Sequence, residues 1–276
     1  MLKLNQLSGI SGETATVSGD EKMSDNSYNE NAYNGFAYCY DLFMDNIPYD
    51  MWAEYLYSIL TEYGITEGTL LELGCGTGSM TECMIAKGYD SIIGLDSSED
   101  MLMMAREKNL PGVLLIQQDM RELELPDEVD AVYCVCDGMN YLLEPQDLQR
   151  VFTRVKRFLK AGGVFVFDMK TDYFYREILG DRMIAENRDD ASFLWENEYH
   201  QDTGINEYLL TVYQLEDPDN DLFSRCDELH YQRAYATELV QSLAEEAGLT
   251  CKAVYQAFTR EPVKPDNERI YYIFQN

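Results

Sequence analysis

Between residues 69 and 168, short apolar segments with the character of strands alternate with segments that have helical patterning. Repeated strand–helix units place successive strands parallel in one sheet and cover both of its faces with helices, through right-handed crossovers. This alternation predicts an α/β fold with a doubly wound, Rossmann-like sheet. The expected strands are 69–73, 91–95, 113–117, 129–135 and 164–168, and the expected helices are 79–87, 98–108 and 146–159.

The alternation stops after Lys170 and resumes near the C-terminus. Three β-rich runs separated by turn residues predict an inserted antiparallel β meander, with strands at 193–200, 205–215 and 223–231. A helix at 237–247 and strands at 251–258 and 270–274 then complete a mostly parallel, seven-stranded sheet. We therefore expect residues 27–170 and 235–276 to form one domain, and residues 171–234 to form an inserted lid or substrate subdomain.

The N-terminal part of the chain changes character near residue 28. Residues 1–26 are rich in Ser, Gly, Thr, Asn and Asp and cannot bury enough apolar area to fold alone. We expect them to form a disordered tail, and Met23 is an alternative to Met1 as the true start of the protein.

Aromatic residues crowd the segment that follows. Tyr33, Phe36 and Tyr40 are spaced i, i+3 and i+7, which predicts one face of a helix that packs on the core. Pro48 interrupts the pattern, so a second helix is expected over residues 49–63.

The net charge limits the partners of this chain. The 50 Asp and Glu residues outnumber the 21 Lys and Arg residues, which gives a formal net charge of −29. Proteins bind nucleic-acid phosphates by presenting Lys and Arg, so we expect no nucleic-acid partner. The same acidic surface would attract a cationic ligand.

The sequence indicates a cytoplasmic protein without a metal site. The N-terminal residues lack the apolar core of an export signal, and no run approaches the ~18 apolar residues of a membrane span. An odd number of cysteines, seven, is typical of a reduced compartment. Cys134 and Cys136 lie in an apolar run that is expected to be a buried strand, without the two further ligands that a structural metal needs.

A glycine-rich turn, Gly74-Cys75-Gly76-Thr77-Gly78, lies between the first expected strand and its helix. Glycines permit positive φ angles and a close approach of the backbone to a ligand, and free amides at a helix start suit a carboxylate or a phosphate. Asp96 ends the second strand, where a carboxylate can accept both ribose hydroxyls. Asp119 follows the third strand and is placed to receive an adenine amine. These features together predict a nucleoside site.

Spacing and charge favour S-adenosylmethionine over a dinucleotide. Gly78 comes two residues after Gly76, whereas the dinucleotide fingerprint places its third glycine three residues after the second. Glu72 lies two residues before Gly74, and its carboxylate would repel a pyrophosphate and attract a cation. S-adenosylmethionine carries both an ammonium and a sulfonium group.

Four motifs resemble those of class I S-adenosylmethionine-dependent methyltransferases: ELGCGTG (72–78), GLDSSEDMLMMARE (94–107), QQDMREL (117–123) and FLKAGGVFVFDM (158–169). Further segments are similar to a bacterial subgroup of small cytosolic methyltransferases, many of unassigned substrate. These are YNGFAYCYDLFMDNIPYDMW (33–52), CDGMNYL (136–142), the three-strand insertion and ERIYYIF (268–274). The resemblance extends from about residue 28 to the end of the chain.

The resemblance implies S-adenosyl-L-methionine as cofactor and assigns residues to it. From the methionine half to the adenine, these are Glu72, Gly74, Cys75, Gly76, Gly78, Asp96 with Ser97 or Met101, Asp119 and Met120. Tyr33 is expected to cover the cofactor from the N-terminal helix. Trp52 is expected either to assist Tyr33 or to pack in the core.

The end of the fourth strand is expected to lie near the transferred methyl group, because such sheets bind ligands at the carboxyl ends of their strands. Cys136 and Asp137 would lie there, and Asp137 is the candidate general base if the acceptor is a hydroxyl or an ammonium. Tyr141 would face the acceptor. His200, in the inserted strands, is a candidate substrate contact, and neither His200 nor His230 is assigned a catalytic role.

The expected activity is methyl transfer to a small molecule that the sequence does not identify. Enzymes that methylate nucleobase amines carry Asn/Asp-Pro-Pro-aromatic at the fourth strand, whereas this chain has Asp137-Gly138-Met139-Asn140. A non-catalytic S-adenosylmethionine-binding protein and an NAD-dependent oxidoreductase remain as alternatives. The oligomeric state is left open.

Overall fold

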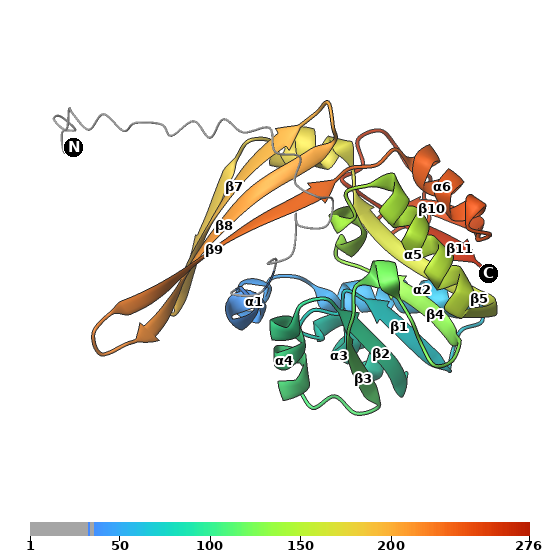
Figure 1. Ribbon diagram of the computed structural model, residues 1–276, viewed down its shortest axis with the longest axis horizontal. Helices are drawn as coiled ribbons and strands as arrows, with labels where there is room; N and C mark the ends of the chain where they lie inside the picture. Colours follow the sequence, from blue (N-terminus) through green and yellow to red (C-terminus); the bar gives the residue numbers. More distant parts are fainter. Residues whose placement is uncertain (1–32, 34–35) are drawn as a thin grey trace.

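The computed structural model describes residue 33 and residues 36–276 (Figure 1). Its larger sheet has seven strands in the order β10-β11-β5-β4-β1-β2-β3. The strands β5, β4, β1, β2 and β3 pair in parallel, and β11 runs antiparallel to both β5 and β10. The prediction of a mostly parallel, Rossmann-like seven-stranded sheet is confirmed. The strands are β1 (Thr69–Leu73), β2 (Ser91–Asp96), β3 (Val113–Gln117), β4 (Val129–Cys134), β5 (Leu159–Lys170), β10 (Thr250–Gln256) and β11 (Arg269–Gln275).

The strand order creates a crevice between β1 and β4. The chain runs from β1 to β2 and β3 on one side of the sheet, and β4 then returns to the other side of β1. The connections after β1 and β4 therefore diverge, and doubly wound sheets bind ligands at such a point. Across these strands, Glu72 of β1 lies in register with Gly94 of β2 and Tyr133 of β4.

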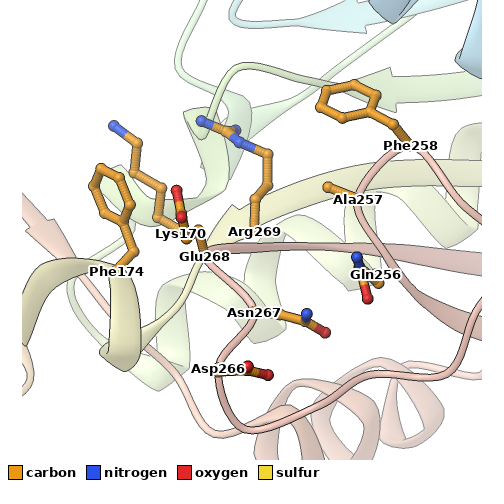
Figure 2. Close-up of a pocket in the computed structure, with 9 residues that line it drawn as sticks. All are labelled: Lys170, Phe174, Gln256, Ala257, Phe258, Asp266, Asn267, Glu268 and Arg269. Carbon is orange, nitrogen blue, oxygen red and sulfur yellow. The ribbon is translucent and has the colours of Figure 1, made fainter. Parts of the chain in front are cut away.

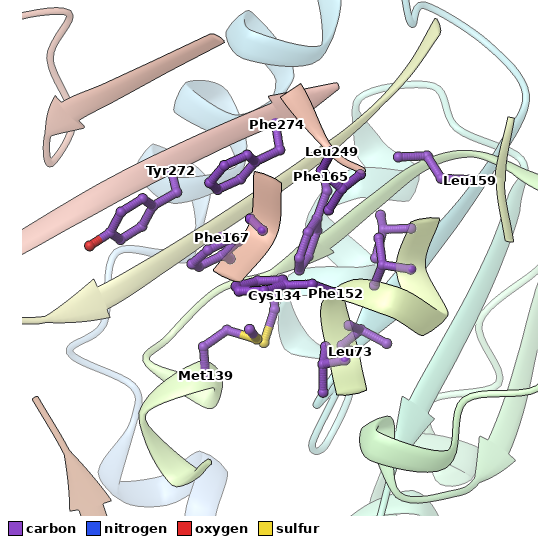
Figure 3. Packing of buried hydrophobic residues seen from close by; sticks show 14 of the residues in the cluster. Leu73, Cys134, Met139, Phe152, Leu159, Phe165, Phe167, Leu249, Tyr272 and Phe274 are labelled. Carbon is purple, nitrogen blue, oxygen red and sulfur yellow. The ribbon is translucent and has the colours of Figure 1, made fainter. Parts of the chain in front are cut away.

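Helices cover both faces of this sheet. On one face, α5 (Pro145–Phe158) and α6 (Thr237–Glu246) enclose a cluster rich in aromatic residues. Figure 3 shows the centre of this cluster, where Phe167 packs against Phe165 and Phe152, with ring centroids 4.9 and 5.7 Å away. On the other face, α2 (Tyr49–Glu62) and α3 (Ser79–Ala86) bury a second cluster. The helix α4 (Glu99–Glu107) contacts β2 and β3.

The segment between β5 and α6 forms a second, antiparallel sheet that extends away from the larger one (Figure 1). Its strands are β6 (Met183–Asn187), β7 (Ala191–His200), β8 (Ile205–Asp217) and β9 (Leu222–Arg233), and a π-helical segment, Phe174–Leu179, precedes them. The prediction of a three-strand meander is wrong by one strand. The sequence MIAEN of β6 has no alternating apolar face, because four of its five residues are exposed.

The first described helix, α1 (Ala37–Phe43), is shorter than the aromatic spacing predicts. Tyr33 lies before this helix with a φ angle of 64°, so the prediction that it belongs to the helix is wrong. The helix packs against the inserted sheet, with Phe43 and Phe193 ring centroids 4.8 Å apart, and it also contacts α4. It therefore lies between the inserted sheet and the larger domain (Figure 1).

Other sequence-based expectations concern the tail, the membrane and the cysteines. The expected disordered tail, residues 1–26, and the choice between Met1 and Met23 lie outside the described residues. None of the helices that the structure describes combines the length and apolar content that crossing a membrane requires. All seven cysteines lie within the described part of the chain as free thiols, and Cys134 is buried in the core cluster of Figure 3.

Candidate active site

The glycine-rich turn after β1 leaves an open space beside its backbone. Gly74, Gly76 and Gly78 all have positive φ angles, of 71°, 53° and 80°. A Cβ atom added to Gly76 would meet no heavy atom within 4 Å, so the protein itself does not fill the space beside this residue. The turn is anchored because the amides of Gly74 and Cys75 both donate to the Leu95 carbonyl, at 2.7 and 2.9 Å. A rigid turn bordered by an empty cradle suits a ligand that lies against the backbone.

The Asp96 carboxylate joins this turn to the next helix. It accepts hydrogen bonds from the amides of Gly76, at 2.7 Å, and Ser98, at 2.9 Å. Burial raises the pKa of Asp96 above its ordinary value, although the two amides act in the opposite direction. The neighbouring Ser97 side chain is exposed, whereas Ser98 caps α4 by accepting from the amide of Met101.

Glu72 is buried beneath the turn. Its carboxylate accepts hydrogen bonds from Thr81 of α3 and from Tyr133 of β4, the latter at 2.9 Å. Burial raises the pKa of Glu72 to about 7, against these two hydrogen bonds. A cation bound nearby would favour the ionised form of this carboxyl, because opposite charges stabilise each other strongly in a buried environment.

The acid that follows β3 is already paired. Asp119 accepts the Arg121 amide at 2.8 Å and also forms an ion pair with the Arg121 guanidinium. It is about one-third exposed at the sheet edge, so a further donor can reach it. Met120 lies closer to the turn, with its methyl carbon 3.9 Å from the position of a Cβ at Gly74.

The segment before α1 is held over these strand ends. The Glu228 carboxylate of β9 accepts the amides of Tyr33 and Phe36, both at 2.8 Å, and the Ser98 hydroxyl donates to the Tyr33 carbonyl at 3.0 Å. Within α1, Asp41 accepts a hydrogen bond of 2.5 Å from Thr77 of the glycine turn. The N-terminal segment thus connects the inserted sheet to the turn.

The end of β4 carries a buried carboxylate between two cations. Asp137 pairs with Lys170 at 3.0 Å and with Arg269 at 2.8 Å. Burial raises the pKa of Asp137, but the two cations outweigh this effect and lower the pKa to about 2. Cys136 and Asp137 both adopt positive φ angles, 63° and 59°, which costs non-glycine residues energy. Trp52 stacks on Arg269, with its ring centroid 4.8 Å from the guanidinium carbon.

Comparison with known proteins identifies the family of this chain. A family model described as a methyltransferase domain matches residues 70–163. The protein YqeM of Bacillus subtilis (strain 168), whose methyltransferase assignment is provisional, is 31% identical over 245 residues, covering 87% of this chain and 95% of YqeM. This chain belongs to the class I S-adenosylmethionine-dependent methyltransferases.

Two further comparisons concern the fold and a substrate. An S-adenosylmethionine-dependent methyltransferase from Clostridium acetobutylicum ATCC 824 superposes with a TM-score of 0.76 at 27% identity, covering 89% of this chain and 99% of that chain. An amino-sugar enzyme of Streptomyces venezuelae, dTDP-3-amino-3,4,6-trideoxy-alpha-D-glucopyranose N,N-dimethyltransferase, is 36% identical over 117 residues, or 42% of this chain and 47% of that protein. The predictions of a methyltransferase and of S-adenosylmethionine as its methyl donor are confirmed.

In this methyltransferase, Tyr33 and Tyr141 belong to a cluster of polar side chains whose other members, Tyr208, His230 and Glu228, were not predicted from the sequence. Tyr141, at the end of the 3-10 helix η2 (Gly138–Tyr141), bonds through its hydroxyl to the hydroxyls of Tyr33, at 2.6 Å, and Tyr208, at 2.5 Å. It also contacts Nδ1 of His230 at 3.2 Å, and Nε2 of His230 bonds to Glu228 at 3.0 Å.

A signal for this cluster was present in the sequence of β9. Glu228, His230 and Gln232 alternate with Leu229 and Tyr231, so one face of the strand is polar over residues 228–232. That polar face is the buried one. His200, the sequence-based candidate for a substrate contact, is the last residue of β7, about 40% exposed, and lines a separate cavity of about 330 Å³ with Leu143 and Glu144.

A cavity of about 410 Å³ opens next to the Asp137 cluster (Figure 2). The Lys170 and Arg269 side chains rise into it side by side, with Phe174 beside Lys170 and Phe258 beyond Arg269. Because both cations are paired with Asp137, and Arg269 also with Asp168, the charge of this cavity is largely neutralised. Among the described residues, no cluster of three or more His, Cys, Asp or Glu side chains could hold a metal ion.

Proposed function

We propose that this methyltransferase transfers the methyl group to a small-molecule acceptor that binds between the C-terminal edge of the larger sheet and the inserted sheet. The observation that carries the proposal is the closure of the site from three directions. The glycine turn forms its floor, the Tyr33 segment is tied across it, and β8 and β9 contribute buried Tyr208 and His230 on the opposite side. So enclosed a site suits a compact molecule better than a polymer.

The residues of the turn fit the methyl donor. We infer that the open space beside Gly76 receives its methionine half, with Glu72 buried behind as the matching negative charge. Asp96, held by two amides at the tip of β2, would accept the ribose hydroxyls. Met101 and Met120 would flank the nucleoside, with Asp119 at the adenine edge and Ser97 outside the pocket.

Asp137 is better suited to hold the site together than to act as a base. A carboxylate whose pKa is near 2 remains ionised at neutral pH and has little affinity for a proton. We propose that Asp137 instead fixes Lys170 and Arg269, and through them the ends of β5 and β11. Trp52, stacked on Arg269, supports the same cluster from α2 rather than contacting the cofactor.

An unsatisfied buried donor supports a polar acceptor. Within the described part of the chain, Nε1 of Trp195 is one of four buried side-chain polar atoms without a hydrogen-bond partner. Trp195 packs 5.0 Å from Tyr208, between ring centroids, and Lys170 lies 6.0 Å above its indole. Because leaving a buried donor unpaired costs about 1–3 kcal/mol, an oxygen of the acceptor bound beside Trp195 would recover that energy.

For this reaction the protein chiefly has to orient the acceptor and exclude water from the site. S-adenosylmethionine supplies an already activated methyl group, so no side chain has to form a covalent intermediate. The turn and the Tyr33 segment would orient the acceptor in line with the methyl group and exclude competing water. Aromatic faces near the sulfonium would contribute roughly 0.5–2 kcal/mol of cation–π stabilisation. The amino-sugar specificity of the Streptomyces venezuelae relative makes an amine-bearing small molecule the first class to test.

A labelling experiment tests this function. The protein is incubated with S-adenosylmethionine carrying a tritiated methyl group and a whole-cell extract of Bacillus subtilis that lacks YqeM. We expect label in the low-molecular-mass fraction, and none with the Gly76→Arg variant, whose side chain would enter the cofactor space. Label that appears instead in the protein or nucleic-acid fraction would contradict a small-molecule acceptor.

A further inference from the structure

The polar face of β9 reaches the candidate methyl-transfer site through a continuous chain of hydrogen bonds. The chain runs from Glu228 to His230, to Tyr141 and to Tyr33, over links of 3.0, 3.2 and 2.6 Å. Glu228 and His230 are both buried, and His230 is fully enclosed. Buried carboxylate–imidazole pairs require complete hydrogen bonding to be tolerated, and this pair has it.

The bonding of Glu228 fixes the tautomer of His230. Burial raises the pKa of Glu228, but hydrogen bonds from His230 and from the amides of Phe36 and Tyr33 reverse the effect and lower the pKa below its ordinary value. An ionised carboxylate only accepts hydrogen bonds, so Nε2 of His230 must carry the proton that it shares with Glu228. Nδ1 of the neutral imidazole then has a lone pair that points at Tyr141.

The same logic orders the tyrosine hydroxyls. Nδ1 of His230 can only accept, so the Tyr141 hydroxyl donates to it and accepts from Tyr33 and Tyr208. Tyr33 therefore donates inward to Tyr141, and its oxygen can still accept from a further donor. The Tyr33 carbonyl accepts from Ser98, two residues after Asp96 at the tip of β2, and the Tyr33 hydroxyl bonds to Tyr141, four residues after Asp137 beyond the tip of β4. Tyr33 thus lies across the tips of β2 and β4, the edge at which such a sheet binds its ligands.

We propose that Tyr33, Tyr141, His230 and Glu228 form a proton relay that deprotonates an ammonium group of the acceptor, so that the acceptor class is a small-molecule amine. The inference rests on the proposed function and deepens it. Tyr33 is the catalytic residue, because its oxygen contacts the acceptor nitrogen. Tyr141, His230 and Glu228 act through Tyr33 and are positioning residues.

The proton and electron movements balance. The ammonium gives one proton to the Tyr33 oxygen while the Tyr33 proton moves to Tyr141 and the Tyr141 proton moves to Nδ1 of His230. The imidazolium is then stabilised by Glu228, as an aspartate stabilises the histidine of a serine-hydrolase triad. The freed lone pair of the nitrogen forms the N–CH₃ bond while the S–CH₃ bond breaks. The electron pair of the S–CH₃ bond stays on sulfur. The methylated product leaves as an ammonium, and the proton on His230 returns through Tyr141 and Tyr33 to water that enters the vacated acceptor site.

The groups that face His230 come from four elements or segments. They are Glu228 on its own strand, Tyr208 of β8, stacked at 4.7 Å, Tyr33 before α1 and Tyr141 of η2.

Two variants test the relay, with the tritiated extract assay as the probe reaction. His230→Gln and Tyr141→Phe should each lower the rate of methyl transfer by roughly 10²–10⁴-fold. The affinity for S-adenosylhomocysteine should not change, so the loss lies in the transfer step. Tyr213→Phe of β8, which keeps the ring that packs on Arg225, is the matched control and should keep the wild-type rate. A wild-type rate in His230→Gln would overturn the relay.

A spectroscopic measurement does not depend on activity. The chain has two histidines, so ¹⁵N-labelled imidazoles give a spectrum of two residues that His200→Gln assigns. We expect His230 to carry its proton on Nε2 at neutral pH. A proton on Nδ1 would overturn the proposed direction of transfer even if a variant failed to fold.

Blocking amines in the extract tests the acceptor class. The low-molecular-mass fraction of the extract is first treated with N-hydroxysuccinimidyl acetate, which acetylates amines, and is then used in the assay. We expect this treatment to abolish the incorporation of label. Incorporation that survives acetylation overturns the amine assignment and leaves small-molecule methylation intact. Absence of label from the untreated extract would instead contradict the proposed function.

Discussion

The buried carboxyl of Glu72 makes a quantitative prediction about stability. Burial raises the pKa of Glu72 from 4.5 to about 7, so the native state holds a proton that the unfolded chain loses at a lower pH. A raised carboxyl pKa gives stability that is complete below the unfolded pKa and is lost as the pH rises through the folded pKa. The full loss is about 3.4 kcal/mol at 1.36 kcal/mol per pKa unit, of which about 2.5 kcal/mol falls between pH 5 and pH 8.

The substitution Glu72→Gln removes this titration. A glutamine can still accept hydrogen bonds from Thr81 and Tyr133, the two donors to Glu72. The free energies of unfolding are measured by urea denaturation without cofactor. The value for the variant minus the value for wild type should therefore rise by about 2.5 kcal/mol between pH 5 and pH 8. Any constant cost of the substitution cancels in this comparison, because it is the same at both pH values.

The result that would refute the reasoning is a difference between variant and wild type that stays constant from pH 5 to pH 8. Glu72 would then ionise at its ordinary pKa, which means that water or a cation reaches it in the free protein. The matched control is Glu82→Gln, on the exposed side of α3, which removes a carboxyl that solvent already reaches and should show no such pH dependence.

Three further predictions follow from the same site. Wild-type affinity for S-adenosylmethionine should rise from pH 6 to pH 8, because the cation favours ionised Glu72, and calorimetry on Glu72→Gln should show no such rise. Asp137→Ala should cost about 3 kcal/mol in urea denaturation at pH 7, because it leaves Lys170 without its carboxylate partner; a loss below about 1 kcal/mol would contradict the cluster's role. Gly94→Ala should cost roughly 1–3 kcal/mol and weaken S-adenosylhomocysteine binding, because its Cβ would lie 2.9 Å from Leu115 Cδ2 and 3.0 Å from the Cys75 sulfur of the turn; unchanged binding would contradict the coupling of this contact to the cofactor site.

The parts of the fold that could be predicted from sequence are those that local patterns determine. The strands β1 and β4 and the second half of β5 are buried between two layers of helices, so their sequences are almost continuously apolar. Gly74, Gly76 and Gly78 were identifiable because a turn with three positive φ angles requires glycine. The strand β6 was missed because its exposed residues give no alternation.

The candidate site was harder to predict because tertiary contacts create it. Tyr33 has helical spacing to Phe36 and Tyr40, but two hydrogen bonds from its segment to Glu228, across 192 and 195 residues, hold it outside the helix. The environment of Asp137 depends on Lys170 and Arg269, which follow it by 33 and 132 residues. The sequence shows only a carboxylate at the end of β4, which suggested a general base. The two cations lower the pKa of Asp137 to about 2, which makes it a poor base.

A calorimetric titration of S-adenosylhomocysteine into the wild type and Gly76→Arg tests most directly where the cofactor binds. A side chain at Gly76 enters a space that the protein leaves empty, and the φ angle of 53° costs it only about 1–2 kcal/mol. The variant should therefore fold and yet bind the ligand at least 100-fold more weakly, a difference of about 2.7 kcal/mol. Equal affinity in the two proteins would place the cofactor away from the glycine turn and contradict the proposed site.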